Sequence, residues 1–372
     1  MERKTPLTRV VHQLPHLGPG AESEQERARF DRNELAVVLS HYDIGVLQSA
    51  KSFSRGSRRA PKARIVSETG DYLLKRRAEG QDDPRRMTFS HELQKHLARE
   101  NFPVAPLVPT RRTKETALEL NGRMYELFHF VPGRRFGNTT SDSWEAGAVL
   151  GQLHLLLSSF KSRYRPPLSS FHAIKGINEK IERIPTMICQ LEGEEGKKIA
   201  QECCTYLRRV YREAAKKTEQ LGFSQWRDSF LHGDWHPGNL LFTGKEVSSV
   251  LDFDSARSEP RSVEFANALL QFSMCMGSVS SLSSWPKGLD VSFIEAMASG
   301  YQASSRSSLT PNECIAIPWL MIEAIVAESV FPIAATGMFG KLPGSQFLSV
   351  VKEKVGWIRP RAASLAELLE TS

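Results

Sequence analysis

Apolar and polar residues alternate in short runs between about Ser49 and Val131, which is the pattern of half-buried strands. Turn signals separate these runs, first Glu68-Thr-Gly-Asp71 and later Asn121-Gly122. Pro132-Gly133 ends the region. The expected strands are 63–67, 71–75, 116–120 and 124–131. The pattern therefore predicts a small antiparallel β region built from hairpins.

Two helices accompany these strands, one between the hairpins and one before them. The first is expected over Thr88–Asn101, where apolar residues recur at helical spacing. The second is shorter and carries Leu35, Val38 and Leu39 on one face. Residues 1–29 are polar, rich in Arg, Glu and Pro and without periodicity, so we expect a flexible tail there.

From Ser141 onward the helical period dominates. Helices are expected over 144–158, about 175–222 and from Val263 to the end, interrupted by short strands near 240–242 and 249–252. A strand-rich segment followed by a helical one is an α+β arrangement of a small antiparallel β lobe and a larger, mainly helical lobe. We therefore divide the chain into a tail (1–29), an N-terminal lobe (30–132) and a C-terminal lobe (133–372), with a ligand in the cleft between the lobes.

Composition narrows the class of protein. The net charge of +7 suits an anionic ligand, although alone it decides little. Five scattered cysteines without a C-x-x-C pair argue against a disulfide framework or zinc site and favour a cytoplasmic location. The richest apolar run, Ile315–Ala335, contains Glu323 and Glu328, so we expect a buried helix rather than a membrane span.

The strongest chemical signal is His232-Gly-Asp-Trp-His-Pro-Gly-Asn239, followed by Leu251-Asp-Phe-Asp254. Asp234, Asn239 and Asp252 have the spacing used in kinase-type phosphoryl transfer. In that chemistry Asp234 accepts the proton of the acceptor hydroxyl, while Asn239 and Asp252 give hard oxygen ligands to Mg²⁺. Each residue alone is more simply interpreted as a turn former or cap, and only the joint spacing favours catalysis.

The neighbours of these residues have open or supporting roles. We expect His232 and His236 to hydrogen-bond the loop and fix Asp234, because Mg²⁺ prefers oxygen and no other ligands complete a zinc set. Asp254 either supports the metal shell or binds Arg257. Gly233 and Gly238 permit tight backbone paths.

A nucleotide requires a further set of residues in the N-terminal lobe. Lys75 ends a predicted strand and is expected to neutralise the phosphates, held by Glu92 of the following helix. Solvent-exposed positions are the ordinary interpretation of both. Gly56 and Ser57 are expected to cover the phosphates with backbone N–H groups, in an Arg-rich segment that either holds a polyanion or forms a solvated face. A Walker-type loop is absent from the sequence, which disfavours P-loop chemistry.

Adenine needs an apolar slot with backbone groups along its edge. The segment Glu126-Leu-Phe128-His-Phe130 is expected to provide that backbone, and Leu241 the floor of the slot. Ile65 or Leu73 would form the roof. Ordinary core positions are the alternative interpretation for each of these side chains.

These motifs resemble the aminoglycoside phosphotransferase and choline kinase family, which has the protein-kinase-like two-lobe fold. The resemblance covers roughly residues 45–270 and is most specific at residues 232–239 and 252–254. It implies an enzyme that uses ATP and Mg²⁺ to phosphorylate a hydroxyl of a small molecule, with Asp234 as base and Lys75 on the phosphates. One departure is Glu264, which stands where the family usually has an Asp that braces the catalytic loop.

Three functions remain open from the sequence. The first is a kinase of an amino alcohol, a sugar or an antibiotic. The second is a Ser/Thr protein kinase of the same fold, although no Ala-Pro-Glu follows Asp252. The third is a catalytically silent binding module, which would not need Lys75, Asp234, Asn239 and Asp252 together. Nucleic-acid binding is disfavoured because the basic segment lacks interleaved aromatic residues.

Overall fold

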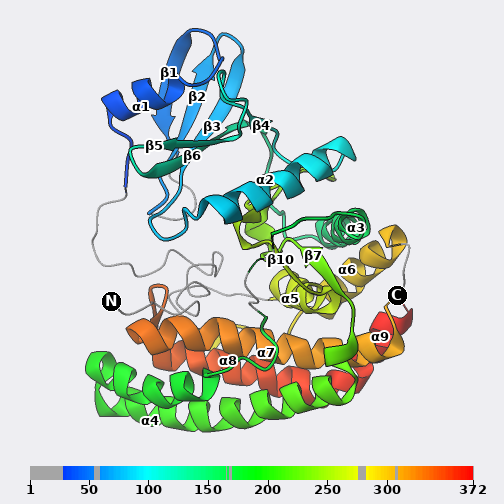
Figure 1. Cartoon of the computed structure of the whole chain (residues 1–372). Helices are drawn as coiled ribbons and strands as arrows, with labels where there is room; N and C mark the ends of the chain where they lie inside the picture. Colours follow the sequence, from blue (N-terminus) through cyan, green and yellow to red (C-terminus); the bar gives the residue numbers. More distant parts are fainter. Residues whose placement is uncertain are drawn as a thin grey trace.

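The computed structural model describes residues 28–53, 59–164, 166, 170–274, 282–305 and 309–371. The expected tail and the loop with Gly56 and Ser57 lie largely or wholly outside these residues. A small lobe of strands stands above a larger helical lobe (Figure 1). This arrangement confirms the predicted α+β class.

The N-terminal lobe is an antiparallel sheet with strand order β1-β2-β3-β6-β4, and β5 also pairs with β6. Both predicted hairpins form, and Asn121 and Gly122 take the positive φ angles of a tight turn. The strands are β1 (Leu47–Ser52), β2 (Lys62–Ser67), β3 (Gly70–Arg76), β4 (Leu107–Val108), β5 (Ala117–Leu120) and β6 (Arg123–His129).

The two faces of this sheet carry different kinds of side chain. Helix α1 (Arg32–Leu39) packs on one face, where Val38 joins Ile65 and Leu74 in a small apolar core. Because side chains alternate along a strand, Lys62 and Lys75 emerge on the opposite face, toward the helical lobe. The sheet thus carries its apolar core on one face and its lysine side chains on the other.

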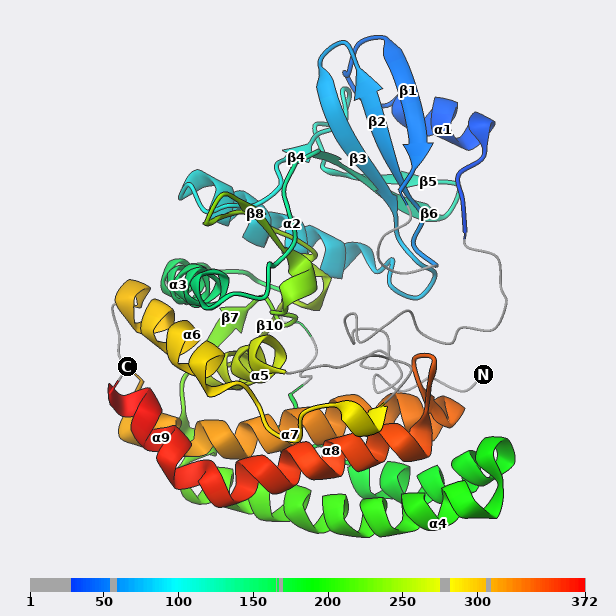
Figure 2. The same cartoon turned by 180° about the vertical axis from the view of Figure 1, so that it is seen from behind.

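Helix α2 (Pro84–Arg99) lies between the sheet and the helical lobe (Figures 1 and 2). It begins four residues before the predicted start, because Asp83 caps the helix and Pro84 suits its first turn. Its buried face includes His91 and Gln94, and its last residue is Arg99.

The C-terminal lobe is mainly helical, with four short strands near the cleft. Its helices are α3 (Thr140–Leu157), α4 (Ile177–Gln220), α5 (Arg261–Ser273), α6 (Val291–Ser304), α7 (Pro311–Thr336), α8 (Gly344–Ile358) and α9 (Ala362–Thr371). The strands near the cleft are β7 (Asp228–Leu231), β8 (Leu240–Thr243), β9 (Glu246–Val250) and β10 (Arg257–Pro260). The short pair β11 (Met338–Phe339) and β12 (Leu342–Pro343) connects α7 to α8.

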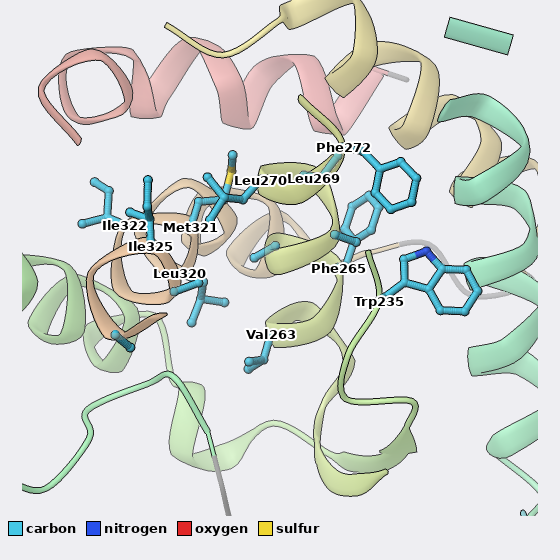
Figure 3. Packing of buried hydrophobic residues seen from close by; sticks show 14 of the residues in the cluster. Trp235, Val263, Phe265, Leu269, Leu270, Phe272, Leu320, Met321, Ile322 and Ile325 are labelled. Carbon is cyan, nitrogen blue, oxygen red and sulfur yellow. The ribbon is translucent and has the colours of Figure 1, made fainter. Parts of the chain in front are cut away.

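Three helices form the layer farthest from the small lobe, namely α4, α7 and α8 (Figure 2). Helix α7 is long and apolar enough to cross a membrane, but 89% of its most apolar window is buried inside the protein. It is therefore the core helix that the sequence predicted. Figure 3 shows its residues Leu320 and Met321 near Leu269 and Leu270 of α5.

Helices α3 and α6 approach each other very closely. A Cβ added to Gly147 would lie 2.1 Å from the carbonyl oxygen of Met297, and one added to Gly300 would lie 1.9 Å from that of Trp144. Only glycine fits at these crossing points. The close contact brings His154 of α3 within 2.8 Å of the Tyr301 hydroxyl of α6.

Candidate active site

The candidate site residues of the sequence gather on two β ladders below the sheet lobe. Strand β7 pairs with β10, and β8 pairs with β9, so that the segments after β7 and β9 lie side by side. The amide of Leu251 donates to the carbonyl of Asn239 at 2.9 Å, which brings Asn239 next to the segment of Asp252. Residues separated by 13 positions in the sequence thus meet in space.

Asp234 and Asn239 are in direct contact. The Nδ2 group of Asn239 donates to both the carbonyl oxygen and the Oδ2 atom of Asp234, each at 3.0 Å. Because a carboxylate only accepts hydrogen bonds, this contact fixes the amide orientation and leaves Oδ1 of Asn239 as the atom that can ligate a cation. The side chain of Asp234 is 18% exposed, so a substrate can reach it.

Both histidines of the motif hold the loop, as the sequence predicted. The amide of Asp234 donates to Nδ1 of His232, whose Nε2 lies 2.8 Å from the carbonyl oxygen of Leu251. Nδ1 of His236 accepts from the amide of Gly238, and its Nε2 lies 3.5 Å from Oδ2 of Asp234. Each ring therefore fixes the direction of Asp234 from a different side.

Glu264 braces the catalytic loop from the first turn of α5. Its carboxylate accepts from the amide of Gly233 and, at 3.3 Å, from that of His232. His154 Nε2 lies 2.9 Å from the same carboxylate. Burial opposes ionisation, but the hydrogen bond from His154 outweighs it and lowers the pKa of Glu264. Glutamate thus serves in a position where the resemblance implies aspartate.

Arg257 is a loop-positioning residue that the sequence did not reveal. Its Nη1 donates to the carbonyl oxygen of Gly233 at 2.5 Å, and its Nε binds Glu259. Gly233 has φ +81°, and an added Cβ would lie 2.2 Å from the carbonyl oxygen of Ser255. The backbone at Gly233 is therefore fixed through both its amide and its carbonyl.

Asp252 lies directly after β9 with its backbone in the left-handed region, at φ 62° and ψ 66°. Such a conformation is strained for a residue other than glycine and is typical of functional sites. Desolvation opposes its ionisation, but Lys75, Lys62 and Arg77 outweigh it and hold the pKa of Asp252 well below its usual range. The carboxylate is therefore charged and suited to a hard cation.

Lys75 reaches across the cleft, and its partner is not the predicted one. Its Nζ lies 3.2 Å from Oδ1 of Asp252, 2.8 Å from Oδ2 of Asp254 and 3.3 Å from Oε1 of Glu126. Glu92 is exposed, because the helical phase of α2 turns its neighbour His91 inward instead. The predicted pairing of Lys75 with Glu92 is therefore wrong, and Asp254 binds Lys75 and Arg77 rather than Arg257.

The predicted adenine edge also requires correction. Glu126 and Phe128 lie inside β6, paired with β3 on one side and with β5 or β4 on the other, so their backbone belongs to the sheet. The amide of Phe130 donates to the carbonyl of Asp71 and so also belongs to the sheet. Backbone groups that contact adenine are therefore expected after this residue in the chain. Ile65 is fully buried in the core of the sheet lobe and cannot form the roof of the slot.

Leu241, the expected floor of the slot, lies near the segment that joins the two lobes, and its role stays a prediction. It is half-buried in β8, and a Cβ added to Gly133 would lie 2.8 Å from its own Cβ. Gly133 follows the segment that leads from the sheet to the helical lobe. Leu73 is half-buried on the cleft face of β3, opposite Arg64 of β2, and remains the candidate for the roof.

Two buried glutamates on α7 differ in their surroundings. Glu323 accepts from the amide of Ala173 at 2.9 Å and lies 3.0 Å from Nδ1 of His172, so it fixes a loop. Glu328 accepts from Gln271 at 2.7 Å and lines an apolar cavity between α5, α7 and α8. Burial and the negative charge of Asp234 raise the pKa of Glu328 to about 8. The charge of Asp234 thus acts on Glu328.

Metal-binding clusters of three or more His, Cys, Asp or Glu residues are absent among the residues that the structure describes. The pair of Asn239 and Asp252 fits a cation of another kind. Magnesium keeps several waters and is held by one or two protein ligands together with phosphates. The two hard oxygen donors, one of them a charged and partly exposed carboxylate, fit this ion.

A model of the phosphotransferase enzyme family matches residues 50–311, which is more than half of the chain. The chain belongs to this family. It is accordingly a kinase-type phosphotransferase, and the resemblance inferred from the motifs is confirmed. The match includes Lys75, Asp234, Asn239 and Asp252 within its limits.

Relatives and solved structures extend this finding. Homoserine kinase of Methylocella silvestris is 29% identical over 248 residues, which are 63% of this chain and 68% of the relative. Stress response kinase A of Escherichia coli is 27% identical over 190 residues, or 48% of this chain and 51% of the relative. The structure of an aminoglycoside phosphotransferase from Alicyclobacillus acidocaldarius superposes with a TM-score of 0.66 at 16% identity, covering 91% of this chain and 96% of the other. The last likeness supports the shared fold.

Proposed function

We propose that this phosphotransferase moves the γ-phosphate of ATP to the hydroxyl of a small molecule that carries an amino group. The observation that supports this most is the joint placement of Asp234, Asn239 and Asp252 on one side of the cleft and Lys75 on the other. In the reaction Asp234 accepts the proton of the acceptor hydroxyl as the new O–P bond forms and the bond from the γ-phosphorus to the bridging oxygen breaks, so that ADP leaves. Its direction is set by the contacts from Asn239 and the two histidines.

Asn239 and Asp252 would hold Mg²⁺, which supplies positive charge for the phosphates when it is bound. Lys75 is close to Asp252 and Asp254 and has the charge to contact phosphate oxygens in the same place. Desolvation works against its charge, but these two aspartates raise the pKa of Lys75, so it stays protonated. The cleft thus offers the cations that a triphosphate needs.

Glu328 supports an acceptor with an amino group. Along one face of α5, Glu264 holds the catalytic loop, and Asn267 and Gln271 follow toward Glu328. Seven residues of helix span roughly 10 Å, so Glu328 lies a short distance below the catalytic loop. The ammonium of Lys354 lines the same cavity and donates to the carbonyl of Gly288. A buried carboxylate in such surroundings prefers a cationic partner over an uncharged one. An ammonium group is therefore the expected complement.

The function can be tested by incubating the full chain with ATP, Mg²⁺ and a panel of hydroxy amino acids, amino alcohols, sugars and aminoglycosides. We expect phosphorylation of an amino-group-bearing alcohol, detected by ³¹P NMR, and none of its deaminated analogue. Phosphorylated protein without a phosphorylated metabolite would favour the Ser/Thr kinase alternative. Absence of turnover with ATP bound would favour a silent module.

A further inference from the structure

We propose that Glu126 and Arg77 form the pair that positions Lys75, in the place that the sequence assigned to Glu92, and that Arg77 docks the sheet lobe onto the segment of Asp252. This inference rests on the proposed use of ATP. Lys75 and Arg77 belong to the sheet lobe and lie 177 positions or more before Asp252 and Asp254, their partners on the other lobe.

Glu126 is the centre of a buried charge cluster. Its side chain is completely buried, directly opposite Lys75 in the pairing of β6 with β3. Its carboxylate lies 3.3 Å from Nζ of Lys75 and accepts from Nη2 of Arg77 at 3.0 Å. Burial opposes ionisation, but Arg77 and Lys75 outweigh it and keep the pKa of Glu126 well below its usual range. Glu126 is therefore a fixed negative charge beside the phosphate-binding amine.

Helix α2 contributes to this cluster through His91 rather than Glu92. Nε2 of His91 lies 2.8 Å from Oε2 of Glu126, and Nδ1 lies 2.9 Å from the Thr116 hydroxyl. Because a carboxylate only accepts hydrogen bonds, Nε2 of His91 donates to Glu126. Helix α2 thus supports the carboxylate of Glu126 through a hydrogen-bond donor on His91.

Arg77 connects this cluster to the other lobe. Its Nη1 lies 2.6 Å from Oδ1 of Asp254, while Lys75 contacts Oδ2 of the same carboxylate at 2.8 Å. The side chain of Arg77 is only 4% exposed, so the contact is little screened by water. When phosphates draw Lys75 away from the aspartates, Arg77 still holds Asp254. The forked guanidinium therefore keeps the lobes in register during nucleotide binding.

The test compares Glu126→Gln with Glu92→Gln, which removes the same charge from the exposed face of α2. Isothermal titration measures the affinity of the full chain for ATP with Mg²⁺ and, separately, for adenosine, which has no phosphates. We expect Glu126→Gln to weaken ATP binding by about 10- to 100-fold, the range for one charged hydrogen bond. Adenosine binding should stay unchanged, and Glu92→Gln should alter neither affinity.

The outcomes distinguish a failure of the positioning role of Glu126 from a failure of the proposed function. Unchanged ATP affinity in Glu126→Gln would overturn the positioning role. Equal losses for ATP and adenosine would overturn it too, because a purely structural defect does not distinguish the ligands. A wild-type chain that binds ATP no better than adenosine would instead contradict the proposed function itself.

Arg77→Lys tests the docking role independently and remains informative if Glu126→Gln fails to fold. Lysine keeps the charge but cannot reach Glu126 and Asp254 together. We expect kcat to fall by about 10-fold with little change in the KM of the acceptor. The neighbouring Arg76→Lys is the control, because Arg76 binds Glu34 within the sheet lobe. Equal kcat values for Arg77→Lys and the wild type would contradict the docking role.

Discussion

The two sides of the catalytic cleft are held in different ways. On the helical side, buried groups such as Glu264 and Arg257 bind the backbone of the loop that carries Asp234. On the sheet side, Lys75 and Arg77 are held by side-chain charges, some of which belong to the other lobe. The difference teaches that the loop of Asp234, the proposed base, is held by backbone contacts in the absence of a substrate, whereas Lys75 is held by charges that phosphates can replace.

The largest expected effect concerns the base itself. Asp234→Ala should lower kcat by about 10²- to 10⁴-fold, because proton transfer to a positioned side chain contributes that much. The fold should be unchanged, since the loop is held through its backbone. Steady-state kinetics and circular dichroism check the two statements. Turnover at the wild-type rate would contradict the role of Asp234.

The brace of the loop should matter next. Glu264→Ala removes a buried carboxylate that serves two amides and His154, so we expect a loss of about 3–5 kcal/mol in the free energy of unfolding. Urea denaturation measures it. Glu259→Ala is not a suitable control because Glu259 binds Arg257, but the exposed Glu194→Ala is. A loss no larger than in that control would show that the helical side is not held by Glu264.

The metal ligand gives a third, smaller effect. Asp252→Asn keeps the shape of the side chain, and asparagine tolerates the left-handed backbone at this position. We expect nucleotide affinity to become independent of Mg²⁺ concentration, because the charged ligand is lost. Titrations with and without EDTA measure this. A persistent Mg²⁺ dependence would place the ion elsewhere.

The effect that is smallest for a change of one pH unit is the pH dependence that Glu328 introduces. Its pKa is raised from 4.5 to about 8, so the folded chain keeps a proton that the unfolded chain releases. Stability contributed by the neutral form is therefore lost as the pH rises between these values, by at most about 1.4 kcal/mol per pH unit. Glu328→Gln should remove this dependence of the unfolding free energy on pH, measured by denaturation at several pH values between about 5 and 8. An equal slope in both proteins would disprove the assignment.

The difference between the two sides also explains what could be predicted from the sequence. Asp234, Asn239 and Asp252 lie within one short stretch, so their spacing carries the geometry. The partners of Lys75 do not, because Asp254 is 179 positions away and Glu126 is on a different strand. Glu92 was chosen by its place on a helix, but helical phase turns it to solvent. No local pattern distinguishes Arg77 from the neighbouring Arg76.

Two further errors have a similar origin. Strand β2 alternates cations with apolar residues, and the sequence alone does not say which of its faces α1 covers. Ile65 was therefore assigned to the wrong face: it lies in the core beneath α1. The adenine edge was also placed too early in the chain, because Glu126 and Phe128 lie inside the expected strand 124–131 and their backbone pairs within the sheet. The division of the chain into lobes at residue 132 stays a prediction.

Helix α7 contains Pro332 one turn after Glu328. Proline has no N–H, so it cannot donate to the carbonyl oxygen four residues earlier, which is that of Glu328. The turn with the buried carboxyl is therefore also a turn where the helix lacks one of its own hydrogen bonds. This part of the cavity wall is therefore less rigid than a regular helix. It also offers the main-chain carbonyl of Glu328 as a hydrogen-bond acceptor beside the side-chain carboxyl group. The softness of this part of the cavity wall thus depends on Pro332, which does not itself line the cavity.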